Sequence, residues 1–313
     1  MNLKELGNLL KQAFQSWNED KAARLAAALS FYAVFAIAPV LIIAVAIAGQ
    51  VLGPAEVQMQ LLNQLTATIG PQGADLIQSM LENARKPTDS LVASILAIIT
   101  LMLGAAGAFG QLQDALNTIW EVKARTGSVI RRLLAEKFLS FLMVMGLGLV
   151  LLAALIASTA LSALNTPIGR PTTALTDLLG IINLFGSFGI IALVFAVILK
   201  VIPDVHIRWR DVWPGALLTA VLFTLGKYAI GLYLSHSSVG SAYGAAGSLV
   251  IVLLWIYYSA QIFLLGAEFT KVYARRSGSP VRPTPQAQAV TTEARAQEGL
   301  APAQPPDHAT LLR

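Results

Sequence analysis

Lys227 is the residue whose position most directly suggests chemistry, because it lies inside a long apolar run. A charged group at the centre of a membrane-crossing helix costs at least about 2.5 kcal/mol, so such a residue is a functional candidate. Small and polar residues share its helical face, namely Ala216, Ala220, Thr224, Gly231 and Ser235. This stripe predicts a side chain that faces neighbouring helices or a cavity. We expect an ammonium that attracts an anionic ligand; the alternative is a lysine that snorkels to the interface or caps a broken helix.

Carboxylates lie at the ends of the long apolar runs rather than within them. The candidates are Asp114 and Glu268, and Arg24 lies at a similar depth at the start of another run. Gln261 and Glu268, seven residues apart, share one helical face, with Tyr258 beside them. A cluster of Arg24, Asp114 and Glu268 could therefore bind and release a proton or a small cation. The alternative is a set of separate charges that fix the depth of each helix.

Other kinds of chemistry find no support in the sequence. The chain has no cysteine, which excludes disulfides, thiolate zinc sites and iron–sulfur clusters. The histidines His206, His236 and His308 lie in different loops or in the tail and lack ligand spacing. Neither a nucleotide-binding glycine loop nor a nucleophile elbow is present. We therefore expect no enzymatic activity, no cofactor, no metal ion and no nucleic-acid partner.

The elements that must position these residues are membrane helices. Of the 313 residues, 56% are apolar and only 12% are charged, whereas a soluble domain carries about 25% charged residues. About 20 apolar residues suffice for a helix to cross the bilayer. The sequence predicts an all-α integral membrane protein with six transmembrane helices, approximately at residues 27–48, 91–111, 138–160, 180–200, 213–234 and 244–265.

The distribution of basic residues predicts the orientation of these helices. Of the 22 Lys and Arg residues, the expected outer side holds Arg85, Lys86 and Arg170, and Lys227 lies within a span. All the others fall in the N-terminal arm, two alternate loops and the C-terminal segment. Because loops rich in Lys and Arg remain inside, both termini are expected to be cytoplasmic.

Three regions flank or interrupt the predicted membrane domain at residues 26–276. Residues 1–25 form an amphipathic cytoplasmic arm, expected at the membrane interface. In the first outer loop, two apolar sets on either side of residues 70–73 predict an amphipathic helical hairpin. This hairpin either lies on the outer leaflet, caps the outer mouth, or packs on the span ends. Residues 277–313 are rich in Pro, Ala, Gln and Thr, and we expect a disordered cytoplasmic tail.

Several stretches together resemble the YihY/BrkB family of bacterial inner-membrane proteins, formerly mislabelled as ribonuclease BN. They are AAALSFYAVFAIAP at 26–39, FGQLQDALNTIW at 109–120, WPGA at 213–216, GKY at 226–228, SAYGAAGSL at 241–249, WIYYSAQI at 255–262 and GAEFT at 266–270. The resemblance implies a six-helix protein of the bacterial inner membrane, in agreement with the span count. Members have been discussed as virulence factors, cation/proton antiporters and participants in lipid transport. The ribonuclease label does not fit these residues.

The leading functional hypothesis is a transporter-like protein that moves an anionic lipid or other amphiphile. Lys227 would contact the headgroup, glycines in the second and fourth helices would permit movement, and the outer hairpin would gate the exit. The first alternative is cation/proton antiport through Asp114 and Glu268. The second is a non-transporting scaffold whose basic arm and loop recruit cytoplasmic partners or anionic lipid.

Overall fold

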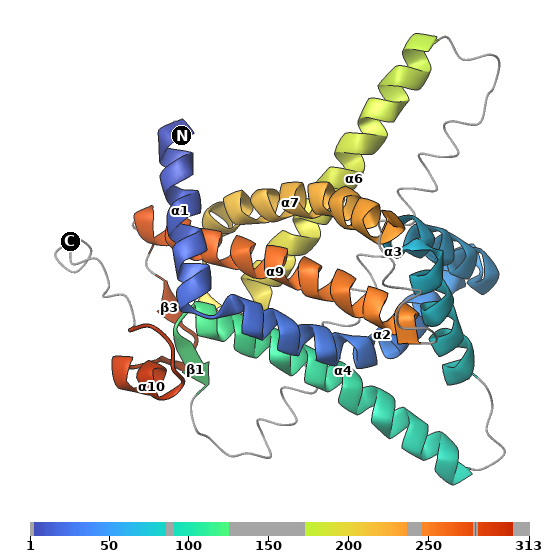
Figure 1. Cartoon of the computed structure of the whole chain (residues 1–313), viewed down its shortest axis with the longest axis horizontal. Helices are drawn as coiled ribbons and strands as arrows, with labels where there is room; N and C mark the ends of the chain where they lie inside the picture. Colours follow the sequence, from blue (N-terminus) through green and yellow to red (C-terminus); the bar gives the residue numbers. More distant parts are fainter. Residues whose placement is uncertain are drawn as a thin grey trace.

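Long helices dominate the protein, for which a computed structural model describes residues 3–85, 91–124, 173–236, 246–277, 279 and 281–302. The longest are α2 (Ala22–Leu52), α4 (Leu91–Ile119), α6 (Thr173–Val201), α7 (Trp209–His236) and α9 (Gly247–Arg276). Their contacts arrange them as neighbours in the order α4–α2–α9–α7–α6, which can be followed in Figure 1. Because the chain reverses between them, one end of the bundle collects the starts of α2 and α7 and the ends of α4, α6 and α9.

The apolar composition of these helices is that of membrane spans. Within the described residues, three helices are long and apolar enough to cross a bilayer, at Ala22–Gln50, Trp209–Tyr233 and Gly247–Arg276, and a shorter apolar helix covers Phe188–Val201. A helix pairs its own backbone N–H and C=O groups, which is necessary in the bilayer interior because no water is there to bind them. The predicted helical membrane fold is thus confirmed. The predicted span at 138–160 lies outside the described residues, so the count of six spans stays a prediction, as does their orientation.

Glycines allow the closest approaches between helices. A Cβ atom added to Gly215 of α7 would overlap Thr270 Oγ1 of α9, and one on Gly266 would overlap Thr219 Oγ1 in return. Each threonine hydroxyl donates to the carbonyl of the glycine one turn before it in its own helix. At the α2–α4 crossing, a Cβ on Gly104 would lie 2.8 Å from the Phe35 carbonyl oxygen. Small residues therefore set the spacing at both crossings.

The segment predicted as the first outer loop folds as α3 (Pro54–Arg85), which is two helices joined at a kink. The kink lies at Gly70, whose φ of 79° and ψ of 169° are not helical, directly before Pro71. Ile69 and Ile77 on either side of the kink pack with Leu41 of α2 and Val252 of α9. The predicted hairpin of amphipathic helices is confirmed, and its apolar face covers the far end of the bundle.

The N-terminal arm is helical and packs on the last long helix. Helix α1 (Leu3–Glu19) buries Leu9 and Ala13 against Phe269 and Val272 of α9. It is separated from α2 by a bend at Asp20 and Lys21, where Lys21 has a φ of 51°. The arm is a helix whose most buried face contacts α9, and its place in the cytoplasm and at the membrane interface stays a prediction.

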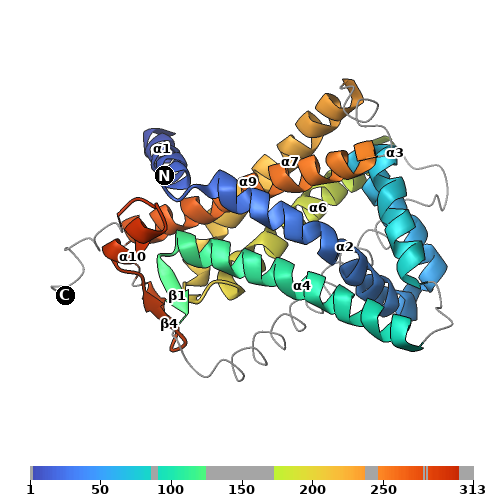
Figure 2. The same cartoon turned by 60° about the horizontal axis from the view of Figure 1, so that its bottom comes forward.

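The C-terminal segment is ordered, so the prediction of disorder over 277–313 is wrong for residues 281–302. Strand β3 (Arg282–Pro283) pairs antiparallel with β2 (Val205–His206), and β4 (Ala287–Ala289) pairs antiparallel with β1 (Val122–Ala124). Helix α10 (Thr292–Gln297) follows, and Figure 2 shows β1 and β4 side by side near it. Composition missed this order because the segment pairs with loops of the membrane domain instead of building its own core. We call residues 281–302 the C-terminal strap.

Candidate functional site

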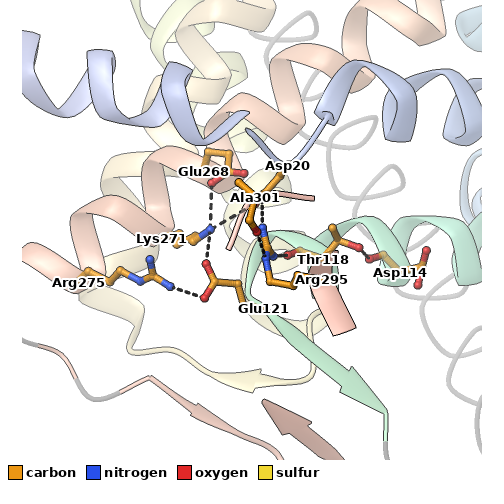
Figure 3. A network of polar contacts seen from close by, with 9 residues as sticks. All are labelled: Asp20, Asp114, Thr118, Glu121, Glu268, Lys271, Arg275, Arg295 and Ala301. Carbon is orange, nitrogen blue, oxygen red and sulfur yellow. Dashed lines mark hydrogen bonds and ion pairs between the residues drawn. The ribbon is translucent and has the colours of Figure 1, made fainter. Parts of the chain in front are cut away.

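A cluster of charged side chains lies where the C-terminal strap meets the end of the bundle. Its members, which we call the ion-pair cluster, are Asp20, Glu121, Glu268, Lys271, Arg275 and Arg295. They come from four places: the bend between α1 and α2, the turn after α4, helix α9 and helix α10. Figure 3 shows them converging on one point.

Lys271 is at the centre of the ion-pair cluster. Its Nζ lies 3.1 Å from Glu121 Oε1, 3.3 Å from Asp20 Oδ2 and 3.7 Å from Glu268 Oε2. The Lys271 side chain is 2% exposed and that of Glu268 is 0% exposed. Arg275, one turn further along α9, binds the other oxygen of Glu121 at 3.0 Å. A buried charge requires such partners, since removing it from water is costly.

Unusual backbone conformations occur at or next to two residues whose carboxylates lie beside Lys271. Within the described residues, the non-glycine residues with positive φ are Lys21, at 51°, and Glu121, at 57°. Glu121 belongs to the ion-pair cluster, and Lys21 directly follows Asp20, which also belongs to it. Such left-handed conformations carry a modest cost for residues other than glycine. Both bends therefore place a carboxylate beside Lys271 at the expense of local strain.

Arg295 connects the C-terminal strap to the ion-pair cluster. Its side chain is 3% exposed, and one terminal nitrogen pairs with Asp20 Oδ1. The other terminal nitrogen donates to the Thr118 carbonyl, at 3.4 Å, and Nε donates to the Ala301 carbonyl, at 2.7 Å. The guanidinium thus joins α4, α10 and the bend after α1.

The structure places Glu268 in a cluster, but with other partners than the sequence predicted. Arg24 and Asp114 are exposed, and Figure 3 shows the Asp114 side chain apart from the ion-pair cluster. The predicted association of Arg24 and Asp114 with Glu268 is therefore wrong. The bend after α1 brings in Asp20 instead of Arg24, and the turn after α4 brings in Glu121 instead of Asp114.

Asp114 lies within electrostatic reach of Glu298 in the C-terminal strap. Partial removal from water raises the pKa of its carboxyl above the ordinary value, and the carboxylate of Glu298 raises it further, while the ammonium of Lys123 opposes both effects. Lys123 and Glu298 themselves form an exposed ion pair at 3.3 Å. The pKa of Asp114 is therefore influenced by Glu298 of the strap and by Lys123 of β1.

A second polar contact that sequence reasoning missed fixes the loop between α6 and α7. The Asn117 amide donates to Asp204 Oδ2 at 2.8 Å, and its carbonyl oxygen accepts from the Asp204 backbone N–H at 2.9 Å. Gln113 donates to the other oxygen of Asp204 at 3.2 Å. The signal available in sequence was the spacing of Gln113 and Asn117, four apart on one helical face. These bonds connect the end of α4 directly to the α6–α7 loop.

Lys227 lies at the boundary between two faces of α7. Ala216 and Ala220 on its predicted stripe are buried, whereas Thr224, Lys227 and Gly231 are half-buried. The Ser235 side chain lies outside the described residues. On the adjoining face, large apolar side chains are exposed along the whole helix, namely Trp213, Leu217, Val221, Leu225, Tyr228 and Leu232. The Lys227 Nζ lies 5.2 Å from the centre of the Tyr228 ring, within the range of a cation–π contact.

Tyr258 of α9 lies against α7. Tyr258 is half-buried, and its ring occupies the space over Gly226, the residue before Lys227, where a Cβ would overlap the phenol. Gln261 is also half-buried. The structure therefore brings Tyr258 to the level of Lys227, while Glu268 lies far along α9 in the ion-pair cluster.

The charges of the ion-pair cluster leave little room for a metal ion. Its three carboxyl groups already lie around Lys271. Two of them pair with arginines as well, Glu121 with Arg275 and Asp20 with Arg295. Within the part of the chain that the structure describes, no group of three or more His, Cys, Asp or Glu side chains could hold a metal. The arrangement is suited to holding helix ends together.

Long apolar helices with exposed apolar faces, joined at one end by buried ion pairs, define a helical integral membrane protein. The model of the family described as Virulence factor BrkB matches residues 13–291. The chain belongs to this family, which confirms the resemblance drawn from its motifs.

Curated relatives carry the name UPF0761 membrane protein. One from Pseudoalteromonas translucida is 26% identical, over 85% of this chain and 88% of its own length. One from Stenotrophomonas maltophilia is 29% identical, over 84% of this chain and 60% of its own length, so the chain spans less than two thirds of that relative. One from Yersinia pestis is 31% identical, over 69% of this chain and 70% of its own length. No solved structure matches the chain.

Proposed function

We propose that this membrane protein moves an anionic lipid or a similar amphiphile within or across the bacterial inner membrane. The observation that carries the proposal is the position of Lys227, a half-buried ammonium beside a continuous exposed apolar face of α7. An anionic amphiphile has the complementary shape and chemistry: its headgroup would bind the ammonium while its acyl chains would lie along Leu225, Tyr228 and Leu232.

The surroundings of Lys227 support a role for its charge in binding. No carboxylate in the described residues forms an ion pair with it, in contrast to Lys271, which has three such partners. The Tyr228 ring provides a modest cation–π contact. An ammonium that is partly removed from water and lacks a paired carboxylate attracts an anion more strongly than one at the surface.

Cation/proton antiport is the second candidate. One observation favours it: both oxygens of Glu268 are buried and accept no hydrogen bond from the described residues. Exchange of a cation there would have to displace Lys271, whose ammonium already lies 3.7 Å from Glu268. Asp114, the other proposed carboxylate, is exposed and lies apart. The geometry therefore supports antiport less well than it supports lipid movement.

The proposal is for a carrier rather than an enzyme, with membrane lipids as its partners and both termini in the cytoplasm. A scaffold with no substrate remains the third candidate, and its basic arm would then bind anionic lipid or a cytoplasmic partner. A scaffold predicts no lipid movement in purified vesicles, which separates it from the leading proposal.

The test reconstitutes the purified protein into vesicles that contain a fluorescent phosphatidylglycerol, and measures how fast the label moves between leaflets. Lys227→Met should slow this movement at least about tenfold, because the headgroup loses its charged partner, and Lys227→Arg should retain most of it. The control variant Lys123→Met removes an exposed lysine and should leave the rate unchanged. Equal rates for the wild-type protein and a folded Lys227→Met variant would overturn the proposal.

A further inference from the structure

The C-terminal strap joins parts of the bundle that are distant in the sequence. β4 pairs with β1, directly after α4, and β3 pairs with β2, between α6 and α7. Arg295 then reaches Asp20, between α1 and α2. Since α4 and α6 are at opposite ends of the helix order α4–α2–α9–α7–α6, the strap connects the two outermost helices of the row.

The same helices diverge away from the strap. In Figure 1, α4 and α6 run apart from their strap ends toward the far side of the bundle. At the strap end, hydrogen bonds between Asn117 and Asp204 hold the end of α4 to the α6–α7 loop. Any movement that separates these helices at this end must break these hydrogen bonds and the pairing of the strap with β1 and β2.

We propose that the C-terminal strap is a clasp that holds this end of the bundle closed. The ion pair between Arg295 and Asp20 keeps the strap docked. The clasp rests on the proposed function in one respect, because passage of a substrate headgroup requires this end to open. Docking of the strap itself is independent of any transported molecule.

The charges of the ion-pair cluster show why Arg295 controls docking. With the strap in place, Asp20 pairs with both Arg295 and Lys271. When the strap leaves, Asp20 loses the guanidinium and shares the Lys271 ammonium with Glu121 and Glu268, in a site where Asp20 is 2% exposed. Removing one partner of a buried ion pair is strongly unfavourable, so the guanidinium is held firmly while its partners stay buried.

Apart from Ala287, which is buried in the core at the bundle end with Val281 packed beside it, and two backbone hydrogen bonds from Thr284 and Val290, the remaining contacts of the strap are weak. Its two ladders involve strands of two and three residues, and short two-stranded pairs are marginal by themselves. The ion pair of Lys123 with Glu298 is exposed on both sides and contributes little. A single substitution at Arg295 should therefore release a segment that otherwise stays docked.

Engineered cysteines test docking directly, because the natural chain contains none. Lys123 and Gln288 are exposed and face each other in the register of β1 and β4. The double variant Lys123→Cys/Gln288→Cys should form a disulfide under mild oxidation, since paired residues of antiparallel strands lie within bonding reach. Adding Arg295→Gln should slow this reaction at least about tenfold, whereas Arg282→Gln, an exposed change on the same strap, should not. Equal rates of disulfide formation in all three backgrounds would contradict the proposed role of the Arg295–Asp20 ion pair.

Hydrogen exchange provides a second readout without cysteines. Arg295→Gln should speed amide exchange in residues 122–124 and 287–289, and in the α6–α7 loop at 202–207, while exchange in the middle of α9 stays unchanged. Arg282→Gln again serves as the control. Unaltered exchange at β1 and β4 in a folded Arg295→Gln protein would show that the guanidinium does not hold the strap.

Vesicles then test closure. The disulfide-locked double variant should move fluorescent phosphatidylglycerol at least about tenfold more slowly than the same protein after reduction, and Arg295→Gln should move it faster than the wild type. Equal rates in the locked and reduced states would overturn the clasp. If no form moves the lipid, the proposed function fails instead. The clasp is then tested by hydrogen exchange at residues 115–124 alone. The locked protein must exchange more slowly there than the reduced protein.

Discussion

Lys227 and Lys271 show how the same side chain takes different roles in one protein. Lys271 is 2% exposed and lies within 4 Å of three carboxylates, so its charge is fully used in holding helix ends together. Lys227 is half-buried, and no carboxylate of the described residues pairs with it. The difference indicates a structural role for the first ammonium and supports our proposal that the second binds a ligand.

Replacement of Lys271 with Met should destabilise the protein by about 3–5 kcal/mol, because it leaves buried carboxylates without their shared cation. Thermal unfolding in detergent measures the effect. The matched control is Lys123→Met, whose ion pair with Glu298 is exposed and should contribute less than about 1 kcal/mol. Similar losses for both variants would mean that the buried ion pairs do not hold this end together.

Sequence patterns identified some of these residues for sound physical reasons. Lys227 and Glu268 stand out because charges in or near apolar runs are rare, and Lys271 could have been added because it lies three residues from Glu268 on one helical face. Asp20, Glu121 and Arg295 could not be found in this way. Their positions depend on two left-handed bends and on a docked strap, none of which leaves a periodic signal.

At the scale of elements, the crossing of α7 and α9 depends on paired glycines and threonines. Gly215 lies against Thr270, and Gly266 lies against Thr219, so that each hydroxyl fills the place of a missing Cβ on the other helix. Such small residues let membrane helices approach closely. The close crossing in turn brings Tyr258 over Gly226, next to Lys227.

Substitution of Gly215 with Ala should therefore destabilise the protein by about 1–3 kcal/mol, since the methyl group would overlap the Thr270 side chain and press on the backbone of α9. Gly231→Ala is the control on the same helix, where an added Cβ meets nothing within 4 Å and should change stability by less than about 1 kcal/mol. Unfolding midpoints in detergent compare the two variants. A Gly215→Ala protein as stable as Gly231→Ala would refute the close crossing.

The helical elements themselves were largely predictable. Long apolar runs predict α2, α7 and α9, and the sequence around Gly70 and Pro71 predicts the kink of α3, because each signal is local in the chain. The short strands β1 to β4 were not predictable. Each consists of two or three residues. β1 and β2 form only because the strap, which contains β3 and β4, passes beside them.

At the scale of the whole molecule, the two ends of the bundle are closed by different means. Helix α3 packs over one end with apolar side chains, among them Ile69 and Ile77. The C-terminal strap covers the other end with buried ion pairs and short strands. The exposed apolar face of α7 lies between them, and we propose that the substrate travels along it.

Cysteine labelling should establish the orientation of the molecule. Glu82→Cys, on an exposed position of α3, should react in intact cells with a membrane-impermeant maleimide. Glu293→Cys, exposed on α10, should react only after the membrane is permeabilised, because both termini are expected inside. The cysteine-free wild type is the control. Labelling of Glu293→Cys in intact cells would reverse the proposed topology.

Headgroup selectivity in vesicles tests the role of Lys227 most directly. Movement of fluorescent phosphatidylglycerol and of fluorescent phosphatidylcholine is measured for the wild type and for Lys227→Met. The wild type should move the anionic lipid at least about tenfold faster than the zwitterionic one, and Lys227→Met should abolish this preference, since the ammonium that distinguishes the headgroups is gone. A wild-type preference that persists undiminished in a folded Lys227→Met protein would contradict the proposed role of this residue.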